Sequence, residues 1–282
     1  MSEFEIHSMS RADVDTAIEW AGLEGWNPGL NDADCFYAAD PGGFLIGKFK
    51  GEPVGVISAV KYQRSFGFIG LYIVRPEFRG KGYGLKLWNE AVASLGSRNV
   101  GLDGVVEQQE NYRKTGFGFA YRNIRFEGRR PQAALIGGKD LANLSTLDFE
   151  RINAYDRTCF FEERSSFLRT WLDQPGAFGF GIRAGDALGG YGVLRPCLKG
   201  FKVGPLFADT PELAERILTA LLVCIPDDAV FFLDVPEVNE QSIALAGRHD
   251  MSIVFETARM YTGEPPRLPL EKIFGVTTFE LG

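Results

Sequence analysis

The segment from Arg79 to Gly84 combines residue types that bind anions. Its sequence, Arg-Gly-Lys-Gly-Tyr-Gly, places glycines at alternate positions between an apolar run and a stretch with helical spacing. Because glycine has no side chain, several backbone N–H groups can converge on one ligand, and a following helix adds the positive end of its dipole. Arg79 and Lys81 bring positive charge to the same place. The segment therefore predicts a cradle for a diphosphate.

Two common phosphate-binding loops do not fit this spacing. The dinucleotide fingerprint is G-x-G-x-x-G and the P-loop ends in G-K-[ST], whereas Lys81 here precedes Gly82. The pattern instead resembles the coenzyme A loop of the GNAT acetyltransferase superfamily, whose motif is [RQ]-x-x-G-x-[GA]. Arg79, Gly82 and Gly84 fill its defining positions. The alternative is an ordinary glycine-rich turn between a strand and a helix, with its cations exposed.

The resemblance implies that this loop binds acetyl-CoA. In the family, the loop holds the diphosphate through its backbone N–H groups, which here belong to Arg79, Gly80, Lys81, Gly82, Tyr83 and Gly84. The strand before the loop separates from its neighbour, and its last backbone groups bind the pantetheine arm and can donate to the thioester oxygen. In this chain those groups belong to Tyr72, Ile73 and Val74, and Pro76 is compatible with an abrupt end of the strand.

Acyl transfer also needs a proton for the departing thiolate. Tyr112 begins the segment Tyr-Arg-Lys-Thr-Gly-Phe, which is similar to the family segment Tyr-x-Lys-x-Gly-Phe, whose tyrosine approaches the coenzyme sulfur. A phenol with a pKa near 10 can protonate a thiolate. The alternative is a packed tyrosine whose hydroxyl binds a backbone group. Many family members have an asparagine about six residues earlier, where this chain has Val106, so Gln108, Gln109 or Asn111 could supply that contact with the coenzyme.

A general base is harder to assign from the sequence. Family members often carry a glutamate on the strand before the loop, yet residues 67–74 contain no carboxylate. Glu24, Asp34 and Glu107 are candidates that could act through water, and each could equally be a solvated surface charge. We rank Glu24 first because its glycine-bounded loop, which also contains Trp26, resembles a binding lid. An acceptor amine that is already partly neutral would need no base.

A late strand near the middle of the chain carries further polar side chains. Alternation along a strand places Arg122 and Ile124 on one face and Asn123 and Arg125 on the other. An arginine there could bind an acceptor carboxylate bidentately. We favour the alternative, in which it pairs with an acidic residue from the other half of the chain.

The composition excludes several classes of protein. The chain has 282 residues, 45% of them hydrophobic, which suits one large or two ordinary domains. A net charge of −7 argues against a general nucleic-acid binder. No stretch approaches the ~20 apolar residues of a membrane span, so we expect a cytoplasmic protein. Four scattered cysteines and two histidines predict reduced, packed thiols and no metal site.

The first half shows the element order β-α-α-β-β-β-α-β, which the resemblance implies for an acetyltransferase core. Apolar spacing predicts these elements. They are a strand from Phe4, helices at 11–19 and 31–38, strands at 44–49, 54–60 and 68–74, a helix at 83–95 and a strand at 100–104.

The second half repeats this plan without the anion-binding motif. Gly185 and Gly189 bracket a hairpin with the spacing of Gly51 and Gly55 in the first half. We predict a tandem duplication, with an acetyltransferase domain at 1–130 and a degenerate one at 131–282, and an exchange of strands between the halves could blur the boundary near residues 129–131. Each is expected to be a mixed, mainly antiparallel sheet flanked by helices in an α/β (α+β) fold.

In the second half, residues 204–213 occupy the position of the anion loop. They contain no cation and two prolines, which lack N–H donors, so we expect no diphosphate site there. The second domain is instead expected to form a wall of the acceptor site.

The whole chain is similar to tandem GNAT proteins with an active first domain. The resemblance implies an acetyl-CoA-dependent N-acetyltransferase whose acceptor is a primary amine of a small molecule or amino acid. We expect a monomer or homodimer that binds neither nucleic acid nor membrane. One alternative is a non-catalytic acyl-CoA sensor, which the missing strand carboxylate favours and Tyr112 opposes. The other is a protein lysine acetyltransferase, which an open groove would favour.

Overall fold

The computed structural model describes residues 3–131, 140–185 and 187–282. The elements of the first half are β1 (Phe4–Ser8), α1 (Arg11–Leu23), α2 (Asp32–Ala39), β2 (Phe44–Phe49), β3 (Glu52–Tyr62), β4 (Phe66–Val74), α3 (Tyr83–Leu95), β5 (Asn99–Val105), α4 (Gln109–Lys114) and β6 (Gly118–Arg129). The predicted order of elements is confirmed. The first helix runs four residues further than its predicted end at residue 19, and the strand before the glycine loop begins two residues before residue 68.

The second half follows the same plan. Its elements are β7 (Leu141–Asn143), α5 (Phe149–Phe160), α6 (Ser165–Leu172), β8 (Phe178–Ala184), β9 (Ala187–Pro196), β10 (Phe201–Ala208), α7 (Pro211–Val223), β11 (Val230–Pro236), α8 (Glu240–Arg248), β12 (Ser252–Tyr261) and β13 (Ile273–Gly275). The predicted hairpin is formed by β8 and β9, whose pairing ends at Ala184 and Ala187. Asp186 lies outside the described residues.

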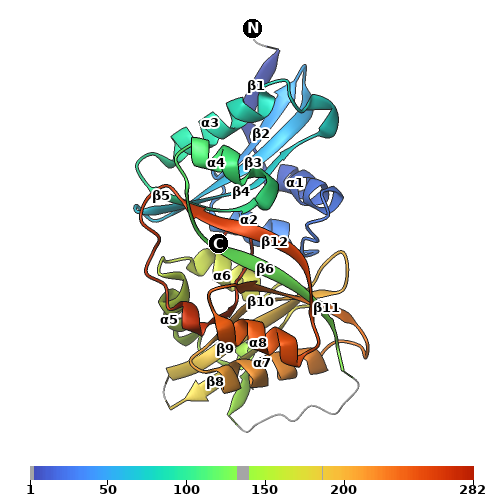
Figure 1. Ribbon diagram of the computed structural model, residues 1–282, viewed down its shortest axis with the longest axis vertical. Coiled ribbons are helices and arrows are strands. Elements are labelled where there is room, and N and C mark those ends of the chain that lie inside the picture. Colours follow the sequence, from blue (N-terminus) through green and yellow to red (C-terminus); the bar gives the residue numbers. More distant parts are fainter. Residues whose placement is uncertain (1–2, 132–139, 186) are drawn as a thin grey trace.

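The two halves share one sheet. In the described residues its order is β1-β2-β3-β4-β5-β12-β6-β11-β10-β9-β8-β7, and β13 pairs with β10. Strand β12 of the second half inserts between β5 and β6, and β6 of the first half pairs with β11. Figure 1 shows β6 and β12 side by side across the middle of the molecule. The halves are therefore joined by an exchange of strands, while the division at residue 130 remains a prediction.

Helices with an apolar face cover the sheet. In α3, Leu87, Ala91 and Leu95 are buried at helical spacing against β3 and β4. On the other side, α2 of the first half packs against α6 of the second, where the rings of Phe36 and Trp171 stack with centroids 6.4 Å apart. One hydrophobic core thus includes residues from both halves.

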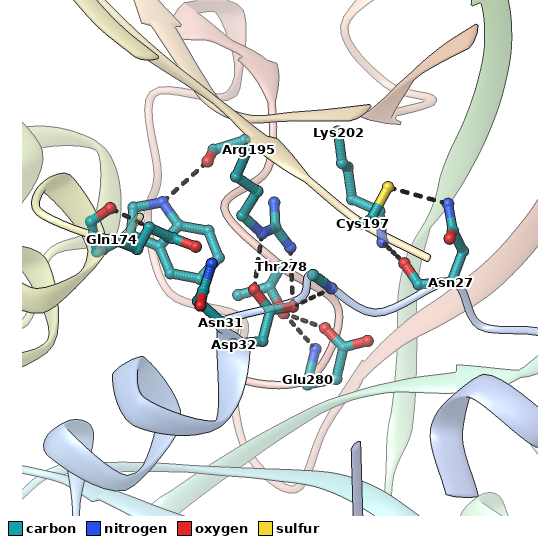
Figure 2. A network of polar contacts seen from close by, with 12 residues as sticks. Asn27, Asn31, Asp32, Gln174, Arg195, Cys197, Lys202, Thr278 and Glu280 are labelled. Carbon is teal, nitrogen blue, oxygen red and sulfur yellow. Dashed lines mark hydrogen bonds and ion pairs between the residues drawn. The ribbon is translucent and has the colours of Figure 1, made fainter. Parts of the chain in front are cut away.

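Charged side chains are buried where the halves meet. Arg125 of β6 donates from Nε and one terminal nitrogen to the two carboxylate oxygens of Asp234 in β11, each at 2.7 Å. Figure 2 shows a neighbouring pair, in which Nε of Arg195 donates to Asp32 at 2.8 Å. Burial opposes charge on Asp234, but the guanidinium of Arg125 outweighs it and lowers the pKa of this carboxyl below its usual value. The favoured pairing of Arg125 with the other half is confirmed.

Replacing Asp234 by asparagine is expected to lower the free energy of unfolding by about 3–5 kcal/mol, because it leaves the charge of Arg125 buried without a counter-ion. The side chains of the pair are only 4% and 2% exposed. Urea unfolding followed by circular dichroism measures the loss. The control Glu150→Gln removes the exposed ion pair with Arg169 and should lower the free energy of unfolding by no more than about 1 kcal/mol. Equal losses in the two variants would contradict the expectation.

In the described ranges, no helix is long and apolar enough to cross a membrane. All four cysteines are free thiols, and Cys35, Cys159 and Cys197 are buried, as predicted.

Candidate active site

The parallel strands β4 and β5 separate at the centre of the first half. They pair from Phe66 and Asn99 to Ile69 and Leu102. Just beyond this point Leu71 has a φ of 46°, and the register between β3 and β4 shifts. An extra residue in one strand bends it away from its neighbour. The separation implied by the family resemblance is therefore present, at a β-bulge in β4.

A cavity of about 600 Å³ opens between the separated strands. Ten of the residues predicted from the sequence line it, namely Glu24, Tyr72, Ile73, Val74, Arg79, Gly80, Gly82, Gly84, Asn111 and Tyr112. The structure therefore brings the glycine loop, the strand end and the tyrosine together around one space.

The glycine loop forms one end of the cavity. Gly80 and Gly82 have φ values of 74° and 82°, and a Cβ atom at either position would meet nothing within 4 Å. Gly82 directly precedes α3 and has no side chain to cap it, so among the described residues the first N–H groups of this helix have no side-chain capping partner. At Gly84, a Cβ atom would lie 2.6 Å from the hydroxyl of Tyr72. The loop combines open space with unpaired donors, which fits a diphosphate.

Two loop residues and two candidate bases lie outside the cavity lining. Lys81 places its ammonium 5.0 Å from the ring centroid of Phe78, and the ring of Tyr83 stacks on Phe4. These two can reach a ligand at the cradle only by backbone groups or by moving. Asp34 is paired with Arg11, and Glu107 is exposed.

Arg79 connects the loop to the helix α1. Its Nε donates to the carbonyl of Val74 at 2.7 Å, and a terminal nitrogen pairs with the carboxylate of Glu24. Glu24, ranked first as a base from the sequence, therefore lines the cavity but is already bound to the cation that would meet the coenzyme.

Glu24→Gln is expected to tighten coenzyme A binding by about two- to fivefold. The substitution removes a negative charge from the cavity and releases Arg79, and an ion pair with this exposure is worth about 0.5–1 kcal/mol. Isothermal titration calorimetry measures the change. A fall of 100-fold in kcat in this variant would instead identify Glu24 as the general base.

Tyr112 reaches the cavity from α4. A Cβ atom on Gly104 would lie 2.2 Å from the ring of Tyr112, so this glycine allows the ring to lie against β5. Another neighbour is Trp88, whose ring centroid is 5.5 Å from that of Tyr112. Burial raises the pKa of Tyr112, so its hydroxyl remains protonated at neutral pH. Among the described residues this hydroxyl has no hydrogen-bond partner, which leaves it available to a ligand.

Asn111 lies beside Tyr112 and also lines the cavity. Its side-chain amide donates to Gln108 at 2.7 Å. Both residues are among the replacements predicted for the family's missing asparagine, and the structure places them together.

The second half of the chain forms the other end of the cavity. Phe255 and Thr257 come from β12, and Phe279 and Glu280 come from the segment after β13. This segment lies in the middle of the molecule, beside the C-terminal label in Figure 1. Sequence reasoning missed all four residues. The only available signal was one carboxylate within an otherwise uncharged stretch at residues 273–282.

In the second half, the start of the corresponding helix α7 has a side-chain cap and a proline, which reduce its free N–H donors. Thr210 caps α7, and its side chain accepts a hydrogen bond from the N–H of Leu213 at 3.4 Å. Pro211 follows and has no N–H. The residues from Gly204 to Ala208 belong to β10 rather than to a loop. Among the described residues, this helix start therefore has fewer free donors than the one after Gly82.

A cavity between separating strands, with a glycine cradle at a helix start, defines a GNAT-type acyltransferase site. Residues 11–118 match the family described as "Acetyltransferase (GNAT) family", and residues 152–275 match the "Acetyltransferase (GNAT) domain". The chain is 32% identical over 265 residues to the holothin acyltransferase of Pseudoalteromonas sp. (strain SANK 73390), covering 94% of this chain and 90% of that protein. It therefore belongs to the GNAT family and is an acyltransferase with two tandem GNAT domains. The family uses acyl-CoA donors.

Solved structures share this fold. A "Putative Acetyltransferase" from Pyrococcus horikoshii has a TM-score of 0.84 at 21% identity, with 100% of this chain and 97% of that chain covered. A tandem GNAT protein from the clavulanic acid biosynthesis pathway has a TM-score of 0.64 at 14% identity, with 93% and 100% covered. At these identities the likeness concerns the fold alone.

Proposed function

We propose that this protein transfers an acetyl group from acetyl-CoA to the primary amine of a small molecule. The observation that carries the proposal is one continuous cavity, which extends from the glycine cradle past Tyr112 to walls from the second half. A donor and an acceptor that enter from its two ends would meet beside the bulge at Leu71. Holding both reactants in one geometry is itself a large part of catalysis.

The proposed roles follow from the position of each group. Backbone donors from Gly80 to Gly84, together with Arg79, bind the diphosphate of the coenzyme, whose thioester supplies an activated acyl carbon. The backbone of Tyr72 to Val74 binds the pantetheine arm. Tyr112 holds a proton on its hydroxyl and gives it to the departing sulfur.

Two observations favour a small acceptor and turnover over the alternatives. The second half contributes walls to the acceptor end, which narrows the room for the side chain of a folded protein substrate, and the holothin acyltransferase is a relative over most of the chain. An available, protonated phenol favours an enzyme over a sensor that only binds the coenzyme.

The proposal is tested by two measurements on the wild-type protein. Calorimetry with coenzyme A is expected to show binding, and incubation of acetyl-CoA with a metabolite extract is expected to yield an N-acetylated product by mass spectrometry. Binding without any acetylated product would favour the sensor. Acetylated lysines on proteins in the extract, without a small product, would favour protein acetylation.

A further inference from the structure

We propose that Glu280 binds the acceptor's amino group and accepts its proton, and that the acceptor is an amine that carries an aromatic ring and no carboxylate. This inference rests on the function proposed above and assigns the base that the sequence did not reveal.

Glu280 is the available carboxylate of the cavity. Three acidic residues of the described ranges line it, and two of them are engaged by arginine. Glu24 pairs with Arg79, and Asp103 accepts two hydrogen bonds from Arg259 at 2.9 and 2.6 Å. Glu280 is 6% exposed. Among the described residues it forms no ion pair, and its side chain accepts one hydrogen bond, from the hydroxyl of Thr278, at Oε2. Its Oε1 is left without a partner there.

The backbone of Glu280 lies against β4 next to the bulge. A Cβ atom on Gly70 would be 2.1 Å from the carbonyl oxygen of Glu280, so only a glycine allows this approach. The segment is held there by the hydroxyl of Tyr62, which donates to the carbonyl of Leu281 at 2.8 Å. The strand itself carries no carboxylate, and the docked segment brings one to the same place.

The cations close to Glu280 each pair with or donate to another group, while one terminal nitrogen of Arg195 has no hydrogen-bond partner among the described residues. Arg125 uses Nε and one terminal nitrogen on Asp234 and donates from the other to the carbonyl of Trp26 at 2.7 Å. Arg195 and Lys202 of the second half also lie close enough to interact electrostatically with the carboxylate of Glu280. Arg195 pairs with Asp32, and Lys202 donates to the carbonyl of Asn27 at 2.8 Å, as Figure 2 shows.

The acceptor end thus offers one free anion and no free cation among the described cavity residues. An ammonium or amine can bind Glu280, whereas a carboxylate on the acceptor would be buried without a partner. The surrounding walls are the aromatic side chains of Trp26, Phe255 and Phe279. These surfaces fit a flat, apolar body attached to the amine.

The proton balance of the reaction assigns separate roles to two side chains. The amine nitrogen forms a bond to the acyl carbon as the bond from that carbon to sulfur breaks. Glu280 accepts the proton that the bound ammonium loses to become a neutral nucleophile. The second proton, released from nitrogen as the amide bond forms, passes to solvent, and Tyr112 supplies a proton to sulfur. Both side chains return to their starting states by proton exchange with solvent.

The first test compares Glu280→Gln with the wild type, using tyramine and acetyl-CoA. We expect kcat to fall at least 100-fold with the Kd for coenzyme A unchanged, and the loss to shrink as rising pH supplies more neutral amine. The control Glu271→Gln, an exposed carboxylate before the same segment, should keep wild-type kcat. Wild-type kcat in Glu280→Gln, or a loss independent of pH, would overturn the role of Glu280.

The second test needs only the wild-type protein and therefore does not depend on how the variant folds. Tyramine is compared with tyrosine, and tryptamine with tryptophan, because each pair differs by one carboxylate. We expect kcat/KM to be at least 100-fold higher for the amines. Equal or better use of the amino acids, or no acetylation of any amine while coenzyme A binds, would overturn the inference. A protein that does not bind coenzyme A would instead refute the proposed function.

Discussion

Gly82→Val is expected to raise the Kd for coenzyme A at least 100-fold. Gly82 has a φ of 82°, a conformation that a β-branched residue strongly disfavours. The space in front of its missing side chain is open, so the valine methyl groups would occupy the room proposed for the diphosphate. The variant therefore loses both the loop geometry and the free volume. Calorimetric titration with coenzyme A measures the loss.

A matched control separates these effects from general strain. Gly51, in the turn between β2 and β3, has a φ of 83° and also meets nothing within 4 Å, but it does not line the cavity. Gly51→Val should lower the melting temperature by a similar amount and leave coenzyme binding unchanged. Wild-type affinity in Gly82→Val would remove the loop from the binding site.

Tyr112→Phe is expected to lower kcat by about 10²–10⁴-fold, the usual contribution of a positioned general acid. The ring that fits against Gly104 and Trp88 is retained, so the Kd for coenzyme A should stay within twofold of wild type. Steady-state release of the free thiol measures kcat, and calorimetry measures Kd.

The pH dependence provides a second readout for Tyr112. Burial raises its pKa above the usual value near 10, so the wild type should keep this proton donor throughout the neutral and mildly alkaline range. Any loss of activity below pH 10 should therefore come from another group. Tyr37→Phe, a tyrosine outside the cavity, is the control and should keep wild-type kcat. A kcat in Tyr112→Phe equal to that of the wild type would show that the hydroxyl of Tyr112 has only a structural role.

The sequence by itself determined the local features of this protein. Helix α3 could be predicted because Leu87, Ala91 and Leu95 recur at the period of a helix, and all three are buried. The cradle could be predicted because Gly80 and Gly82 remove side chains where the backbone takes positive φ. Such signals depend on neighbours a few positions away, and so they are visible in a single chain.

Only the tertiary structure decided which distant segments meet. Apolar alternation marks β6 and β12 as strands but does not say that they exchange between the halves, because every strand offers the same backbone donors and acceptors. It also does not say that Arg125 is neutralised by Asp234. Glu280 reaches the cavity because Gly70 leaves room for its backbone, and that fit depends on packing between the two ends of the chain. The cradle was therefore encoded locally, whereas the acceptor end was created by long-range packing.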